Sequence, residues 1–327
     1  MNRITLLISL FSATIGFSQS YAPPANQAGT TAIHKDSSVF VAWATGIDLK
    51  RGFLDIADTN FMISGSNKVS YGAPSEALYQ AQGSSATIVS LGDGGVATLT
   101  FQRPIFNGDG PDFAVFENSF LPDFLELAFV EVSSDGEHFF RFPAHSENQF
   151  AVQIATYGTM DCRFIHNLAG KYEQGYGTPF DLSDLPVDAL LDVDAITHVR
   201  IIDVVGTIDP TLASLDRFGN PINDPYPTAF ASGGFDLDGV GVIHQKTVGL
   251  PEITANYKVY PNPTAGLLTL DFPIASDVRI IDFSGKVVAF FPAVEYQQLN
   301  LVEFQKGVYF AEITNASGKF TQKLILR

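Results

Sequence analysis

The chain has 327 residues, and its 35 acidic and 19 basic side chains give a net charge of −16 at pH 7. Such an acidic chain repels nucleic acid and anionic lipid surfaces, so we expect neither as a partner. The single cysteine, Cys162, excludes an internal disulfide, and we expect it to be a small buried apolar residue.

The first 18 residues are typical of a signal peptide. Arg3 precedes an uncharged apolar stretch over 4–17, and the small residues Gly16 and Ser18 suit cleavage after Ser18. The apolar stretch is too short to span a bilayer as a permanent helix. We therefore expect a protein that enters the periplasm and loses this segment.

The charge is distributed unequally along the rest of the chain. Residues 19–252 contain 29 acidic and 11 basic side chains, whereas 253–327 contain 6 acidic and 7 basic ones. The clearest break in composition lies at 249–256. We predict an acidic domain over 19–248, a linker over 249–256 and a second domain over 257–327.

The acidic domain has the pattern of an all-β fold. Short β-branched or aromatic runs predict strands at 39–42, 87–91, 96–101, 113–116, 126–133, 138–142, 198–205 and 239–244. Glycine, aspartate and asparagine clusters such as 93–95, 107–111 and 232–234 separate these runs. Helical spacing predicts helices at 181–192 and 75–82. We expect a large jelly-roll-like β-sandwich.

Several loops are rich in the oxygen ligands that calcium prefers. The predicted calcium ligands lie in three segments: Asp109 and Asp112; Asp216, Asn220 and Asp224; and Asp236 and Asp238. Asp236 and Asp238 are two apart in a strand-like run, which places them on one face. The alternative is that each aspartate bonds its own turn backbone. Over the whole domain, we expect at least one structural calcium ion.

Aromatic residues are frequent in the predicted loops, where burial in a core explains them less well. Aromatic faces in loops stack on sugar rings or flat macrocycles, and tyrosine adds a hydroxyl that orients a polar ligand. The predicted ligand-binding residues are Tyr157, Tyr172, Tyr176, Tyr226 and Phe230. The alternative is that these side chains fold back onto the ends of the sandwich.

The sequence gives little support for catalysis. No HExxH or GxSxG motif is present, and Cys162 lacks a recognisable nucleophile motif. Glu117, Glu126 and Glu131 could supply the two carboxylates of a glycoside hydrolase, although Glu131 alternates with valines as on the solvent face of a strand. We expect a protein that is not an enzyme, with a polysaccharide hydrolase as the alternative.

Residues 21–246 contain the segments WATG (43–46), SLGDGGVATLTF (90–101), GPDFAVFEN (110–118), FVEVSSDGEHFFRFP (129–143), YGTPFDL (176–182), ITHVRIIDV (196–204) and SGGFDLDGVGVI (232–243). Through these segments, residues 21–246 resemble a family of bacterial secreted cell-surface proteins. The strands VEVSSDG, VRIID and FDLDGVGV also look like galactose-binding-like jelly rolls. Those domains commonly hold a structural calcium and bind glycans through loops. Some members of the closer family are encoded beside outer-membrane corrinoid uptake systems, which implies a corrinoid or glycan ligand and an uptake receptor as a partner.

The last 75 residues alternate period-2 hydrophobic runs with glycine, proline and asparagine, which predicts a small immunoglobulin-like β-sandwich. They closely resemble the type A C-terminal sorting domain of type IX secretion cargo. The matching motif residues are Tyr260, Pro261, Asn262, Pro263, Gly285, Gly307 and Lys323. The resemblance implies recognition by an outer-membrane translocon and a sortase. It also implies secretion to the outer cell surface through the periplasm.

Together these features predict a secreted, surface-associated protein that captures a glycan or a corrinoid-like nutrient and is stabilised by calcium. Two further classes stay open. One is a hydrolase that acts on surface polysaccharide, and the other is a structural or adhesive protein of the cell envelope.

Overall fold

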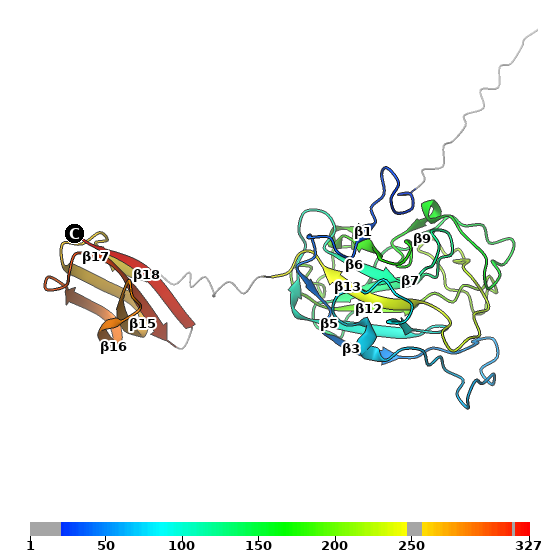
Figure 1. The fold of residues 1–327 in the computed structure, drawn as a ribbon, viewed down its shortest axis with the longest axis horizontal. Coiled ribbons are helices and arrows are strands. Elements are labelled where there is room, and N and C mark those ends of the chain that lie inside the picture. The colour runs from blue at the N-terminus through cyan, green and yellow to red at the C-terminus, as the bar shows by residue number, and fades with distance from the viewer. Residues whose placement is uncertain (1–20, 247–256, 316–317) are drawn as a thin grey trace, which may run out of the picture. The chain divides into compact units, whose positions relative to one another are not determined.

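The computed structural model describes residues 21–246, 257–315 and 318–327. The chain divides into two compact all-β units between Lys246 and Thr247 (Figure 1). The predicted signal peptide (1–18) and the whole of the predicted linker (249–256) lie outside the described residues. Within the described part of the chain, no helix is long and apolar enough to cross a membrane.

The large unit is a sandwich of two antiparallel sheets. The first has the order β1-β11-β6-β13-β2, with β4 also paired to β13, and the second has the order β3-β5-β12-β7-β8. The strands of the first sheet are β1 (Ile33–His34), β2 (Ala42–Trp43), β4 (Val89–Ser90), β6 (Phe113–Glu117), β11 (Tyr176–Phe180) and β13 (Asp236–Val242). Those of the second are β3 (Gly46–Lys50), β5 (Val96–Ile105), β7 (Ala128–Ser133), β8 (Phe140–Arg141) and β12 (Ile196–Asp203). A small separate ladder joins β9 (His145–Ser146) to β10 (Ile165–His166).

The main core of this unit lies between the two sheets. In β12, Val199 and Ile201 are fully buried, whereas the alternate residues His198 and Arg200 are half-buried on the outer face. This is the period of two that places successive side chains on opposite faces of a strand. On the first sheet, β6 is buried along its whole length. The predicted all-β sandwich is confirmed.

The two predicted helices are wrong. Each is reduced to a single 3₁₀ turn, η3 (Leu182–Asp184) in place of 181–192 and η1 (Pro74–Ala77) in place of 75–82; a third turn, η2, covers Cys162–Phe164. Pro186 has no backbone N–H to donate to a continuing helix, and it follows Leu185, the residue that caps η3. Asp188 then accepts from the backbone nitrogen of Leu190, which favours a turn over a helix.

The second unit is a small immunoglobulin-like fold. Its strands are β14 (Lys258–Tyr260), β15 (Leu267–Asp282), β16 (Val287–Asn300), β17 (Gly307–Asn315) and β18 (Gly318–Leu326). Their order is β14-β15-β17-β18, and β16 pairs with β15. Two apolar segments of this unit, 267–272 and 278–282, belong to the one long strand β15, whose pairing with β16 shifts register between them. The second unit has its own hydrophobic core, which includes Leu270, Val278, Ile280 and Ile313.

Candidate functional site

Buried carboxylates gather at one end of the large sandwich. The end of β6 and the start of β13 lie side by side, since Glu117 is opposite Leu237. In the other sheet, β12 ends and β7 starts at the pair Asp203 and Ala128. We call this end of the sandwich the loop end. It is formed by the segments 51–57, 91–95, 118–127 and 204–235, and by 149–158, which packs against them.

Three of these carboxylates hold the loops by accepting hydrogen bonds from the backbone. Asp203 accepts from the nitrogens of Gly94 (3.0 Å) and Phe235 (2.7 Å), and Asp224 accepts from Leu127 (2.9 Å). Asp93 accepts from Ile56 (2.8 Å). Burial raises the pKa of all three carboxyl groups, to about 6 for Asp93. The loop end is thus fastened by carboxylates that are costly to ionise.

A second group of acids lies at the same end, where Glu117 accepts from the Ser119 nitrogen (2.7 Å) and Asp236 accepts from the Ser90 hydroxyl (2.5 Å). Burial, together with the charges of Asp236 and Glu117, raises the pKa of Glu126 well above its ordinary value. The Glu126 carboxylate makes no hydrogen bond or ion pair with any described residue. Burial raises the pKa of Glu117 likewise, and that of Asp236 to about 6. The side-chain oxygen of Asn118, a residue that is 4% exposed, is buried without a hydrogen-bond partner.

Arg51 is the basic residue whose charge acts on this group. Its guanidinium donates to the carbonyl oxygens of Tyr71 (2.5 Å), Ser90 (2.7 Å) and Gly72, so backbone groups take up its donors. Its charge lowers the pKa of Asp236, although burial outweighs this effect. The loop end therefore holds several buried carboxyl groups, and burial favours the protonated form of each.

The predicted calcium ligands do not come together. Asp112 accepts from the nitrogens of Gly108 and Leu182 and from His244, at the opposite end of the sandwich, whereas Asp109 is exposed. In the described ranges, no three histidine, cysteine, aspartate or glutamate side chains form a group that could hold a metal ion. Calcium binding stays a prediction.

The remaining predicted metal ligands also make bonds with the protein. Asp216 accepts from the nitrogens of Phe218 and Asn220, which is the turn role weighed as the alternative. Asp238 accepts from the backbone nitrogens of Gln82 and Gly83. Asp224 and Asp236 lie at the loop end.

The structure separates the predicted aromatic ligand residues into three environments. Tyr157 and Phe230 are 76% and 42% exposed, and their rings stack with centroids 6.1 Å apart and an interplanar angle of 24°. Tyr226 is half-buried, and its hydroxyl donates to Asp55 (3.3 Å). Tyr176 lies in β11 rather than in a loop. The prediction for Tyr172 is wrong, because this side chain is 1% exposed and bonds Thr31 in a core.

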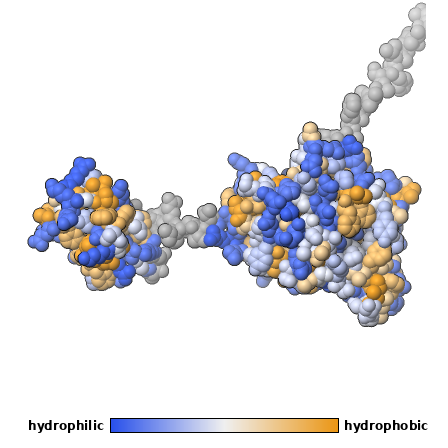
Figure 2. Space-filling model, in the orientation of Figure 1, coloured by the Kyte–Doolittle hydropathy of each residue, from blue (hydrophilic) through white to orange (hydrophobic). Residues whose placement is uncertain are grey.

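The exposed aromatic pair is held by two loops that bond each other. The nitrogen of Tyr226 donates to the carbonyl of Ile154 (3.0 Å), and the Thr156 hydroxyl donates to the carbonyl of Pro227 (2.8 Å). On the face that Figure 2 shows, hydrophobic residues lie in several separate areas between hydrophilic ones. Two adjacent, nearly parallel rings on fixed loops can stack on a ring-shaped ligand.

Sequence reasoning assigns no site role to two of the acids at the loop end. Asp93 lies in a predicted turn (93–95), and Asp203 lies in a predicted strand (198–205). The only available signal was their position at the ends of apolar runs. That position does not reveal which strand ends meet.

The motif residues of the second unit shape its first loop and its hairpin. Asn262 bridges the backbone of β18, since its side chain donates to the carbonyl of Lys323 (2.6 Å) and accepts from the nitrogen of Ile325 (2.9 Å). Gly285 has a φ of +86° in the turn between β15 and β16, a conformation that suits glycine. Tyr260 is 45% exposed at the end of β14.

Comparisons with known proteins identify this second unit. Residues 258–327 match the family described as the secretion system C-terminal sorting domain. No curated protein matches the sequence. Two solved structures are similar to the chain: a β-glucuronidase from Faecalibacterium prausnitzii and the BSP domain of a biofilm associated protein.

Both structural similarities are weak. The glucuronidase is 13% identical with a TM-score of 0.22, and the match covers 89% of this chain and 46% of that chain. The BSP domain is 10% identical with a TM-score of 0.20, and the match covers 71% of this chain and 48% of that chain. The chain thus spans about half the length of each, and neither match carries an argument about function.

The sorting domain defines the class of protein. The chain is cargo of the type IX secretion machinery, exported to the outer cell surface or secreted. The likeness of residues 21–246 to galactose-binding-like domains stays a prediction.

Proposed function

We propose that the protein is a surface capture module that binds a glycan or a corrinoid-like nutrient at the loop end. The observation that carries this proposal is the exposed, stacked pair of Tyr157 and Phe230 on mutually bonded loops. A sugar ring or a corrin macrocycle offers an apolar face of the kind that stacks on aromatic rings. Export to the cell surface would bring the pair into contact with such ligands.

Titration calorimetry on the chain without residues 1–18, against neutral oligosaccharides and cobalamin, tests the proposal. We expect Tyr157→Ala and Phe230→Ala to weaken binding of one of these ligand classes by about tenfold each, as for the loss of roughly 1–2 kcal/mol of stacking. Phe283→Ala is the matched control, because it removes an 87% exposed ring from the sorting domain. No binding of either class, or equal losses in all three variants, would refute a site at the loop end.

We also propose that a calcium ion stabilises the loop end. The support is the grouping of the carboxyl groups of Glu117, Glu126 and Asp236, whose raised pKa values a bound cation would lower, together with the unpartnered Asn118 oxygen. Calcium takes carboxylate, amide and backbone oxygens together, so it does not require three carboxylates. We expect calcium to raise the melting temperature, and Glu126→Gln to reduce that increase. A melting temperature unaffected by calcium and by chelator would overturn this part of the proposal.

The hydrolase alternative has less support from the geometry. Glu117 is 2% exposed, and the Glu131 carboxylate is paired with Arg141 (2.9 Å) and Arg200 (3.4 Å). Turnover of a polysaccharide that disappears in Glu117→Gln would favour the hydrolase over capture.

Export has its own test. Deleting residues 253–327 should leave the protein in the periplasm, as measured by cell fractionation, and unchanged export would contradict the sorting role.

A further inference from the structure

The outer face of the second sheet carries a groove of about 710 Å³, within the range typical of small-ligand sites. Its floor lies on β5, where Thr98 and Thr100 point outward between larger neighbours. The register places Thr98 beside Asp48 on one side and Arg200 on the other. Phe139, from the turn between β7 and β8, also lines the groove. This face is separate from the loop end.

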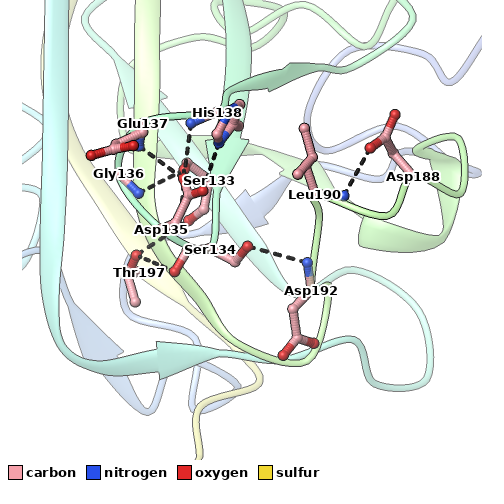
Figure 3. A network of polar contacts seen from close by, with 10 residues as sticks. All are labelled: Ser133, Ser134, Asp135, Gly136, Glu137, His138, Asp188, Leu190, Asp192 and Thr197. Carbon is pink, nitrogen blue, oxygen red and sulfur yellow. Dashed lines mark hydrogen bonds and ion pairs between the residues drawn. The ribbon is translucent and has the colours of Figure 1, made fainter.

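A network of polar contacts fixes the turn that contributes to this groove (Figure 3). Asp135 accepts from the backbone nitrogens of Glu137 and His138 (2.8 Å each) and from the His138 ring (2.7 Å). The Ser133 hydroxyl accepts from the Gly136 nitrogen (2.8 Å). Because these bonds hold the turn, the groove keeps its shape without a ligand.

Positive charge collects along the groove in a domain that is otherwise strongly acidic. Glu131 is opposite both Arg200 and Arg141 across the sheet. Arg141 binds Glu131 with two nitrogens at 2.9 Å, whereas Arg200 approaches it only to 3.4 Å. One carboxylate is thus shared by two arginines, so the three side chains together carry one net positive charge, and Arg200 makes the longer contact.

The groove presents its cations ready for a ligand. The Arg200 guanidinium lies over the Phe139 ring at 3.2 Å, which fixes its orientation. Lys50 lines the same groove and forms no ion pair or hydrogen bond through its ammonium with any described residue. Arg200, held in place, and Lys50, without a partner for its ammonium among the described residues, are flanked by threonine hydroxyls and the Asp48 carboxylate. This arrangement suits a ligand with spaced negative charges and many hydroxyl groups.

We propose that this groove is a second binding site, for a segment of uronate-bearing polysaccharide. Arg200 and Lys50 bind sugar carboxylates, and Asp48, Thr98 and Thr100 bond sugar hydroxyls. The 29 acidic side chains of residues 19–252 repel a densely charged polyanion such as nucleic acid, whereas a short acidic glycan meets mainly the local field of the groove.

Titration of the chain without residues 1–18 with oligogalacturonate tests the site. The comparison ligands are the methyl ester of oligogalacturonate and a sulfated oligosaccharide built from neutral sugars. We expect oligogalacturonate to bind and the ester to bind at least about tenfold more weakly, since each lost charged bond is worth about 1.5–3 kcal/mol. Equal affinity for the ester, preference for the sulfated ligand, or no binding of oligogalacturonate would each overturn the proposal.

Variants then locate the binding. Arg200→Met and Lys50→Met should each weaken binding by about tenfold, and Arg200→Lys should lose less. Arg103→Met is the control, because it removes one charge from an exposed arginine that does not line the groove. Lys50→Met keeps the test valid if Arg200→Met does not fold, since Lys50 is outside the Glu131 network. Equal weakening by Arg103→Met would overturn the site in favour of a general charge effect.

The two proposed binding sites, the groove and the loop end, can be tested separately. Phe230→Ala should leave oligogalacturonate affinity unchanged, and loss of this affinity in Phe230→Ala would overturn a separate groove site.

Discussion

Replacing Asp93 with asparagine should stabilise the large domain at neutral pH. The Asp93 side chain is 4% exposed and accepts from the Ile56 nitrogen, and burial raises its pKa to about 6. The nearby charge of Asp55 raises the pKa further, whereas a bond with Thr228 opposes the shift. An asparagine can accept from Ile56 through its oxygen and donate to the Thr228 hydroxyl through its nitrogen.

The sign of the effect follows from the direction of the shift. An unfolded aspartate has a pKa of about 3.9, so the folded carboxyl binds its proton more tightly. This group therefore favours folding most below about pH 4, loses that advantage as the pH rises to about 6, and destabilises the fold above it. A shift of about 2 units corresponds to about 3 kcal/mol. The weaker bond from Ile56 to an amide oxygen offsets roughly 1 kcal/mol, which leaves a gain of about 2 kcal/mol at pH 7.5.

The single tryptophan, Trp43, makes the measurement specific, because it lies in the large domain and its fluorescence does not report on the sorting domain. Urea unfolding of the chain without residues 1–18, in the presence of a chelator, should show the gain at pH 7.5 and almost none at pH 4. Asp109→Asn, which changes an exposed carboxyl, is the control. Equal stability of wild type and Asp93→Asn at pH 7.5, or the same change at both pH values, would refute the reasoning.

Two further predictions use the same fluorescence assay. Asp135→Asn should destabilise the domain most between about pH 4 and 6.5, because the bond with His138 lowers the pKa of Asp135 and raises that of His138; a loss independent of pH would contradict the pairing. Gly170→Ala should lower the free energy of unfolding clearly more than Gly110→Ala does. Both glycines have φ near +80°, but an added Cβ at Gly170 would lie 1.8 Å from the Glu126 carbonyl oxygen, whereas Gly110 has open space. The control variant, Gly110→Ala, should lose only about 1–2 kcal/mol of unfolding free energy. Equal losses in the two variants would show that the chain relaxes around residue 170.

Several longer strands could be located from the sequence, because alternation of apolar and polar residues is a local signal, whereas β3 and β11 were not predicted. The runs at 96–101, 113–116 and 198–205 overlap β5, β6 and β12 within a few residues. The helix predicted at 181–192 does not form, because Pro186 interrupts the helical spacing of leucine and alanine. Helical spacing alone does not decide a segment whose backbone donors are removed or bonded by aspartate side chains.

The export route and the all-β class of this protein can be predicted from local sequence patterns alone. The sorting motifs follow one another along the chain, and residues such as Gly285 act in their own turn. The tertiary structure alone decided which side chains meet. Asp203 and Gly94 are 109 residues apart, and Arg200 meets Glu131 only because β12 pairs with β7. A period of two tells which face of a strand a residue occupies, but the burial, charge and ligand contacts of that residue depend on which strands become its neighbours.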